Sequence, residues 1–267
     1  MNIGINGIGR IGRGIFRVNY NNPKNKQFKI VAIKDIIPIE NVAYLLKYDS
    51  LYGVFNNHID IDGDHIVVDG KDYIKYYRSK DIKEVPWDKS NVEILIESSG
   101  VAEKSDLNYI IRNKFIKKVI CTWNFPTPDI TIVCGINLND YKNNLHNIIS
   151  ASTCTGNGLV PILHMLSQKY TIEYGHIVTI HPVLSDQKLI DAAHKDYHLG
   201  RMAISSIIPT STSVVKSTLI LHPELKGKLD CISYRVPTTI VSNIDIAIVL
   251  KEKNCYERIL DNKYNLW

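Results

Sequence analysis

The chain has 267 residues, of which 45% are hydrophobic and 22% are charged, and its mean hydropathy is -0.09. These values exclude the disordered and collagen-like classes, and no apolar run approaches the roughly 20 residues that a membrane-spanning helix needs. The net charge of +5 is compatible with a nucleic-acid partner, but the lysines fall in short groups in a predicted loop and at predicted element ends, which is typical of a solvated surface: Lys24, Lys26, Lys29, Lys114, Lys117 and Lys118. We therefore expect no nucleic-acid partner and no membrane association.

The first 150 residues alternate between strand and helix patterns. Residues 2–6 predict a strand, residues 10–20 predict an amphipathic helix, and residues 30–33 predict a second strand that ends on Asp35. The alternation continues, with a helix expected at 104–115 and strands at 65–68, 92–97, 118–121 and 130–134. Because parallel βαβ crossovers are right-handed, residues 1–152 are predicted to form an α/β domain with the doubly wound parallel sheet of a Rossmann fold.

A glycine-rich turn joins the first predicted strand to the first predicted helix. Gly7, Gly9 and Gly12 follow the G-x-G-x-x-G spacing, which allows a tight turn, close approach of backbone N–H groups to a pyrophosphate, and close helix packing. Asp35 lies 23 residues after Gly12, where a carboxylate binds the ribose hydroxyls and repels a 2′-phosphate. The pattern favours NAD over NADP, and a glycine-rich turn followed by a surface aspartate is the structural alternative.

The pattern changes after residue 150. We expect helices and strands in the order helix 157–168, strand 175–180, helix 214–222, and strands 229–236 and 243–250. Two strands in succession without a helix between them predict an antiparallel or mixed sheet, so residues 153–267 form the second predicted domain, of the α+β class. The tail at 251–267 is polar and has only a weak helical pattern.

Cys154 lies among small hydroxyl and glycine residues, shortly before a predicted helix. A helix N-terminus lowers the pKa of a nearby thiol, but Pro161 fits best in a first turn, which moves the expected helix start to about Gly158 and weakens the effect. His181 ends an apolar strand and is a candidate base for activating the thiol. A structural thiol and a structural histidine are the alternatives, and their spacing in the sequence does not show that the two side chains meet.

Cysteine usage and the N-terminal residues bear on location. The five cysteines form no CxxC pair, which suits a reducing compartment better than a disulfide framework: Cys121, Cys134, Cys154, Cys231 and Cys255. Arg10, Arg13 and Arg17 interrupt the first apolar stretch, which is unlike a secretory signal. We expect a cytoplasmic protein.

Several longer motifs point to one family. They are Asn-Gly-Ile-Gly-Arg-Ile-Gly-Arg at 6–13, Tyr-Leu-Leu-Lys-Tyr-Asp-Ser at 44–50, the Cys154 segment, Ile-Ile-Pro-Thr-Ser-Thr at 207–212, Pro-Glu-Leu-Lys-Gly-Lys-Leu at 223–229 and Arg-Val-Pro-Thr at 235–238. On these motifs the chain resembles the phosphorylating glyceraldehyde-3-phosphate dehydrogenases from residue 2 to about residue 250. The resemblance implies a glycolytic oxidoreductase with a Rossmann NAD domain, a catalytic domain, a small aldehyde substrate and a homo-oligomer, usually a homotetramer.

The resemblance also implies residue roles. In that family a cysteine thiolate attacks the aldehyde, hydride passes to the nicotinamide, and phosphate resolves the thioester, which implies Cys154 as nucleophile and His181 as base. The implied cofactor-binding residues are Gly7, Gly9, Arg10, Ile11, Gly12, Asp35, Arg78 and Ser98, with Arg10 and Ile11 at the pyrophosphate and Arg78 near the adenine. The implied substrate- and phosphate-binding residues are Thr153, Thr155, Thr212 and Arg235. No metal is implied.

Some positions depart from the family pattern. Leu184 replaces a phosphate-binding threonine, and of a family run with three arginines only Arg201 remains. An unpaired charged acceptor costs about 1.5 to 3 kcal/mol. The chain also stops before the family's last strands and helix, so we expect an incomplete α+β catalytic domain with a mixed sheet. Two alternatives therefore stay open: a divergent enzyme that oxidises another aldehyde, such as erythrose 4-phosphate, and hydrolyses the thioester, or a non-catalytic NAD-binding remnant.

Overall fold

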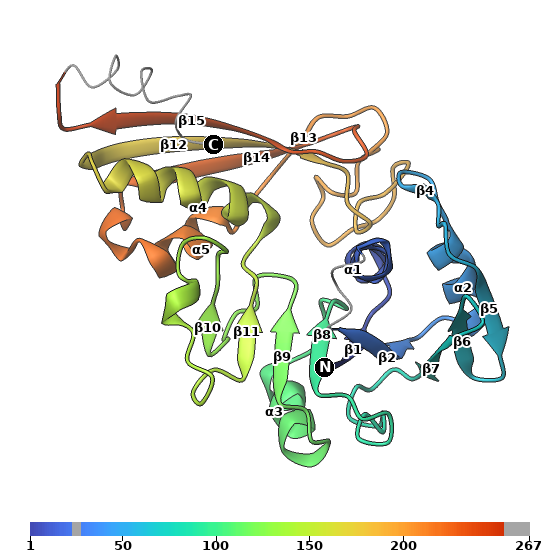
Figure 1. Ribbon diagram of the computed structural model, residues 1–267. Coiled ribbons are helices and arrows are strands. Elements are labelled where there is room, and N and C mark those ends of the chain that lie inside the picture. The colour runs from blue at the N-terminus through green and yellow to red at the C-terminus, as the bar shows by residue number, and fades with distance from the viewer. Residues whose placement is uncertain (23–27, 254–267) are drawn as a thin grey trace. The chain divides into compact units, whose positions relative to one another are not determined.

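The computed structural model describes residues 1–22 and 28–253 (Figure 1). The chain divides into two compact units. Unit 1 comprises Met1–Ile132 and Asn137–Ser152, and unit 2 comprises Val133–Ile136 and the chain from Thr153 onward. Within the described ranges, no helix is long and apolar enough to cross a membrane.

Unit 1 is built on a nine-stranded sheet with the order β10-β11-β9-β8-β1-β2-β7-β6-β5. Its strands are β1 (Asn2–Asn6), β2 (Lys29–Asp35), β5 (Ile59–Asp62), β6 (His65–Val68), β7 (Asp72–Arg78), β8 (Ile94–Glu97), β9 (Lys118–Cys121), β10 (Ile130–Thr131) and β11 (Ile148–Ser150). All neighbours from β10 to β7 pair in parallel, and β6 and β5 add an antiparallel edge. The predicted parallel sheet is confirmed, and its strand order reverses between β1 and β8.

Helices cover both faces of this sheet. On one face Phe16 of α1 (Arg10–Asn21) and Leu46 of α2 (Ile39–Lys47) pack in a core with Ile5. On the other face Leu107 of α3 (Lys104–Asn113) packs with Leu95. This arrangement follows from the strand period of two, which sends successive apolar side chains to opposite faces. The unit also contains a 3-10 turn, η2 (Leu138–Asp140), and a hairpin of β3 (Tyr48–Asp49) and β4 (Gly53–Val54).

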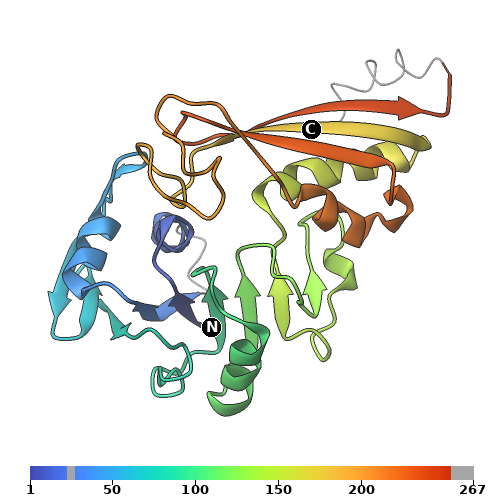
Figure 2. The same ribbon diagram turned by 180° about the vertical axis from the view of Figure 1, so that it is seen from behind.

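Unit 2 contains a four-stranded mixed sheet. Its order is β13 (Ile208–Thr210), β14 (Leu229–Val236), β12 (Ile172–Pro182) and β15 (Asn243–Leu250). β12 is parallel to β14 and antiparallel to β15. Figures 1 and 2 show α4 (Cys154–Ser167) and α5 (Val214–Leu221) on the same side of the sheet, with the 3-10 turn η3 (Pro223–Leu225) after α5. Leu159, Leu163 and Val214 from these helices form a core with Ile177.

The helix that follows the cysteine begins earlier than predicted. It starts at Cys154 instead of near Gly158, with Thr153 as its N-cap. Pro161 therefore lies inside α4, where it removes one backbone hydrogen bond at a cost of about 3 kcal/mol. The cap and the burial of Leu159 and Leu163 offset this cost. The predicted helix start near Gly158 was wrong because it was based on Pro161 alone and did not take the N-cap at Thr153 into account.

Smaller differences concern element ends and short elements. The strand expected at 130–134 ends at Thr131, and Lys29 begins β2 instead of lying in a loop. Lys24, Lys26 and residues 254–267 of the predicted tail lie outside the described residues. Seven helices and strands of the described structure were not predicted: α2, β3, β4, β5, β7, β11 and β13.

Candidate active site

The glycine turn of unit 1 has a conformation that only glycine accommodates. Gly7 has a φ of 90°, and a Cβ there would lie 2.6 Å from the backbone nitrogen of Ser99. A Cβ at Gly12 would lie 2.2 Å from the carbonyl oxygen of Gly7, so helix α1 packs directly on the turn. At Gly9, by contrast, no atom lies within 4 Å of the Cβ position, which leaves the outer side of the turn open for a ligand.

Hydrogen bonds fix this turn to the neighbouring strands. The Ile8 and Ile36 backbone N–H groups donate to the two oxygens of Asp35, each at 2.7 Å. Each carboxylate oxygen keeps a second lone pair, which suits the two hydroxyls of a ribose. The Ser98 hydroxyl donates to the Gly7 carbonyl at 2.6 Å, so Ser98, directly after β8, holds the turn.

The N-terminus of α1 has the features of an anion site. No side chain caps it, and its first turn has no acidic residue. The side chains of Arg10 and Ile11 are exposed there. Arg78, opposite Asp35 in the β2–β7 pair, donates from Nε to the Ile36 carbonyl at 3.1 Å. An uncapped helix start beside an open glycine turn fits the pyrophosphate of a dinucleotide.

Unit 2 brings the predicted thiol and imidazole together. Cys154 is the first residue of α4, and its Sγ lies 3.4 Å from Nε2 of His181 on β12. His181 Nδ1 lies 2.8 Å from the Pro182 carbonyl oxygen, which can only accept a hydrogen bond. Nδ1 therefore carries the imidazole hydrogen, and Nε2 presents its lone pair to the thiol.

This contact changes the acidity of the thiol. The hydrogen bond between Cys154 and His181 is the largest influence and lowers the pKa of Cys154 from its ordinary value of 9.0 to about 7. Burial opposes the shift, and the Thr155 hydroxyl, 3.7 Å from Sγ, adds to it. Near neutral pH about half of the thiol is therefore the nucleophilic thiolate.

The backbone before Cys154 is held in an unusual conformation. The Thr153 hydroxyl accepts a hydrogen bond from Gly156 N at 2.7 Å, which caps α4 and fixes where Cys154 begins. Ser152 is buried and has a φ of 62°, in the left-handed region that non-glycine residues rarely adopt. Such strain is common next to functional groups, and nothing in the sequence signalled it.

Arg235 lies beside the thiol–imidazole pair. It is opposite His181 in the parallel β12–β14 pair, and its buried Nε has no hydrogen-bond partner in the described structure. Burial lowers the pKa of Arg235, while the negative charges of Asp186 and Cys154 oppose this. A guanidinium with an unused donor beside a nucleophile is suited to bind an oxygen of a bound substrate.

The other positions considered for phosphate binding have hydrogen-bond or ion-pair partners outside the thiol–imidazole pair. The Thr212 hydroxyl accepts from Val214 N at 3.2 Å at the start of α5, and within the described residues it makes no hydrogen bond to Cys154 or His181. Arg201 forms an ion pair with Asp191 at 2.7 Å. Leu184 has an exposed apolar side chain, and its backbone N–H donates to Gln187. Among described residues, no group of three or more His, Cys, Asp or Glu is arranged to hold a metal.

Reactivity of Cys154 should follow the thiolate. We expect its alkylation by iodoacetamide, followed by mass spectrometry of the modified residue, to rise with pH to a midpoint near pH 7, because the pKa is lowered. The reactivity is present above this midpoint and lost below it. In His181→Asn the midpoint should move up towards the ordinary value of 9.0, since the largest influence that lowers the pKa is removed while burial still raises it. Equal alkylation midpoints in the unchanged protein and in His181→Asn would contradict the pairing of Cys154 with His181.

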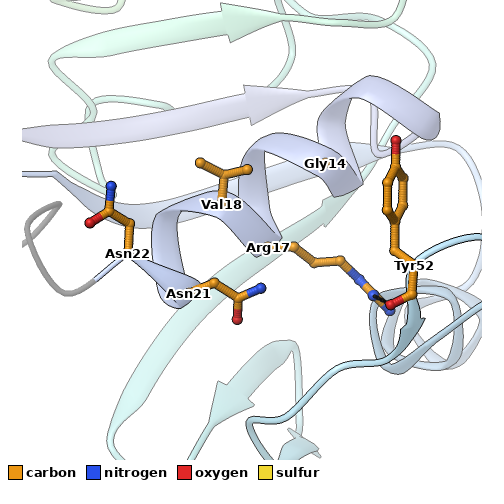
Figure 3. Close-up of a pocket in the computed structure, with 6 residues that line it drawn as sticks. All are labelled: Gly14, Arg17, Val18, Asn21, Asn22 and Tyr52. Atoms are coloured by element: carbon orange, nitrogen blue, oxygen red, sulfur yellow. Dashed lines mark hydrogen bonds between the residues drawn. The ribbon is translucent and has the colours of Figure 1, made fainter. Parts of the chain in front are cut away.

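A separate hollow of about 460 Å³ lies along α1 (Figure 3). Arg17 lines it, but its terminal nitrogens donate to the carbonyls of Leu46 and Gly53 at 3.0 Å. Arg17 thereby ties the end of α2 to the β3–β4 turn. The remaining lining residues are Gly14, Val18, Asn21, Asn22 and Tyr52, which include no nucleophile paired with a base. We assign no chemistry to this hollow.

Unit 1 carries a dinucleotide turn at a sheet crossover, and unit 2 carries a thiol activated by an imidazole. These are the two sites that a nicotinamide-dependent dehydrogenase with a cysteine nucleophile requires. Comparison with known proteins gives the family. Residues 1–105 match the NAD binding domain of glyceraldehyde 3-phosphate dehydrogenase, and residues 153–263 match its C-terminal domain.

Individual relatives indicate the same family. The chain is 38% identical over 258 residues to glyceraldehyde-3-phosphate dehydrogenase 1 of Bacillus cereus, which covers 96% of this chain and 76% of the relative. The corresponding enzyme of Priestia megaterium is 39% identical over 257 residues, with 96% and 76% covered, and that of Borreliella burgdorferi is 38% identical over 259 residues, with 95% and 76% covered. The chain belongs to the glyceraldehyde-3-phosphate dehydrogenase family.

Proposed function

We propose that this protein oxidises glyceraldehyde 3-phosphate with NAD and transfers the acyl group to inorganic phosphate, a glycolytic reaction. The observation that carries the proposal is the 3.4 Å contact between Cys154 Sγ and His181 Nε2, with the thiol pKa lowered to about 7. The family membership supports the substrate and the cofactor. It gives no support to hydrolysis of the thioester, to another aldehyde, or to a remnant without catalysis.

Each part of the chain has a role in this proposal. Residues 1–152 are the NAD-binding Rossmann domain, with the glycine turn and α1 at the pyrophosphate and Asp35 at the ribose. Residues 153–267 are the catalytic domain. The hydrogen-bonded positions of Asp35 and Ser98 and the open side of Gly9 support the first assignment.

The chemistry follows from the thiol–imidazole pair. His181 Nε2 takes the thiol proton, and the Cys154 thiolate attacks the aldehyde carbon, so that a C–S bond forms and the carbonyl pair moves to oxygen. The imidazolium returns the proton to that oxygen. The glycine turn and Asp35 would hold NAD, whose nicotinamide would supply the acceptor for the hydride that leaves the same carbon. His181 takes the hydroxyl proton as the carbonyl re-forms, which leaves a thioester on Cys154.

Phosphate completes the reaction. A phosphate oxygen attacks the thioester carbonyl, the C–S bond breaks, and Cys154 leaves as thiolate. A thiolate with a pKa of about 7 is a good leaving group at neutral pH. Arg235, with its unused Nε, together with Thr153, Thr155 and Thr212, is proposed to hold the anionic groups of substrate and phosphate.

Association with further copies is also proposed. The side of the unit 2 sheet opposite α4 carries Tyr174 and Val249, which are 48% and 53% exposed and pair across β12 and β15. These two exposed apolar side chains support a homo-oligomer, and the mass in solution by light scattering tests it. The described free thiols support a cytoplasmic location, which cell fractionation tests.

Turnover with and without phosphate tests the proposed reaction. We expect NADH formation from glyceraldehyde 3-phosphate and NAD to be sustained only when phosphate or arsenate is present, because water is a poor substitute in attack on the thioester. Sustained NADH formation without either anion would mean hydrolysis. NAD binding without turnover of any triose or tetrose phosphate would contradict the enzymatic proposal.

A further inference from the structure

The hydroxyl of Ser150 joins three backbone segments shortly before Cys154. Ser150 is the last residue of β11 and is fully buried. Its Oγ donates to the Trp123 carbonyl oxygen at 2.9 Å and accepts from the backbone N–H groups of Phe125 and Ser152, each at 3.3 Å. A hydroxyl has one hydrogen to donate and two lone pairs, so these three bonds use the whole hydrogen-bonding capacity of Ser150.

One of these bonds holds the strained residue Ser152. Ser152 is 1% exposed and has a φ of 62°. Its N–H donates to the hydroxyl of the residue two positions earlier, an arrangement that stabilises a local bend of a kind that non-glycine residues rarely adopt. The Ser152 hydroxyl is buried and has no partner in the described structure, so it does not stabilise the bend. The bend at Ser152 therefore depends on Ser150.

The bend leads the chain into the start of α4. Directly after it, the Thr153 hydroxyl accepts from Gly156 N at 2.7 Å, and the Thr153 carbonyl oxygen accepts from Asn157 Nδ2 at 2.8 Å. Thr153 has the extended backbone that an N-cap needs, with φ -111° and ψ 161°. Because Thr153 is the cap, Cys154 is the first residue of the helix.

Pro161 weakens the connection between this first turn and the rest of α4. In an α-helix the N–H of residue 161 would donate to the carbonyl of residue 157, but proline has no N–H and its ring crowds that carbonyl. A helix that began after the first turn would place Pro161 in its own first turn, where proline causes no loss. The turn that carries Cys154 therefore depends on its cap more than a turn of an uninterrupted helix does.

We propose that Ser150 is a positioning residue for Cys154. Its hydroxyl holds the bend at Ser152 and so keeps the first turn of α4 helical, against the effect of Pro161. This turn keeps Cys154 Sγ at 3.4 Å from Nε2 of His181. The three hydrogen bonds of Ser150 are all to backbone groups, so it acts on the thiol through the backbone. The assignment deepens the proposed function, because it rests on Cys154 as the nucleophile.

The first test removes the hydroxyl and measures the thiol. We expect the pH midpoint for alkylation of Cys154 by iodoacetamide to rise in Ser150→Ala from about 7 towards 9.0, because the thiol leaves the imidazole. For a midpoint between about pH 8 and pH 9, alkylation at pH 7 is about 5- to 50-fold slower. The matched control is Ser167→Ala, which removes a buried hydroxyl without a described partner from the other end of α4 and should leave the midpoint unchanged.

A second substitution shows whether Ser150 acts through the first turn. Pro161→Ala restores the N–H that the helix lacks, so the double variant Ser150→Ala, Pro161→Ala should recover a midpoint near 7. A raised midpoint that Pro161→Ala does not lower would show that Ser150 acts by another route, and it would overturn the proposal. An unchanged midpoint in a folded Ser150→Ala protein would overturn it as well.

If Ser150→Ala does not fold, hydrogen exchange in two proteins that keep Ser150 decides the question. In the unchanged protein, we expect the backbone amides of residues 158–160, which donate to the first turn, to exchange at least about 10-fold faster than those of residues 163–166. The difference should shrink in Pro161→Ala, and equal protection along α4 in the unchanged protein would overturn the proposal. Neither experiment needs NAD, aldehyde or turnover, so a failure of the proposed dehydrogenase reaction is seen separately in the phosphate-dependent assay.

Discussion

Cys154→Ser is expected to abolish the formation of NADH from glyceraldehyde 3-phosphate. The serine hydroxyl stays protonated beside His181, whereas the thiol is about half ionised near pH 7. Removing the nucleophile of a comparable catalytic unit costs a factor of about 10⁶ in kcat, so a loss of at least about 10⁴ is expected here. The initial rate of NADH absorbance, at saturating NAD and phosphate, measures it.

The matched control is Cys134→Ser, which changes an exposed cysteine in the same unit. It should keep the unchanged protein's rate, and both variants should bind NAD with the same Kd, because neither residue belongs to the glycine turn. Substantial activity in Cys154→Ser would show that another group attacks the aldehyde. Loss of NAD binding together with activity would point to misfolding instead of lost chemistry.

His181→Asn is expected to lower kcat by about 10²- to 10⁴-fold at pH 7, the usual range for a general base. The loss has two parts, because His181 both lowers the pKa of Cys154 and moves the protons of the hydroxyl group. Only the first part is recovered at alkaline pH. The kcat of the unchanged protein divided by that of His181→Asn should therefore fall as pH rises past 9.0, where the thiol of the variant ionises without the imidazole.

His176→Asn provides the comparison on the same strand. His176 contacts Asp230 at 3.3 Å on the outer side of β12, away from the thiol. This variant should keep both the kcat and its pH profile. A ratio for His181→Asn that stays constant across pH would mean that His181 acts only on the hydroxyl proton and does not set the ionisation of Cys154.

Much of the fold followed from short-range patterns. The ends of β1, β6, β9, β14 and β15 are as predicted, because apolar runs bounded by polar or glycine residues define buried strands well. These patterns did not predict which strands pair with each other. β14 and β15 follow each other in the chain, yet each pairs with β12 and neither pairs with the other. Nothing in one strand's composition encodes its neighbour.

The sequence predicted which residues form the candidate site, but it predicted less about their arrangement in space. Gly7 and Asp35 belong to a spacing with a physical reason, but the tie from Ile8 N to Asp35 depends on tertiary folding. Cys154 and His181 are 27 residues apart, and only the packing of α4 against β12 brings them to 3.4 Å. The burial of Lys34 on β2, where its side chain is 5% exposed, had no sequence signal, since an isolated lysine in a strand is usually exposed.

A single turnover without phosphate tests the central claim most directly. The protein is mixed with an excess of NAD and glyceraldehyde 3-phosphate in the absence of phosphate, and NADH and the intact mass of the chain are followed together. We predict a burst of NADH matched by one acyl group per chain, located on Cys154 and released when phosphate is added. NADH formed without an acyl group on Cys154, or with the acyl group on another residue, would contradict the thioester mechanism.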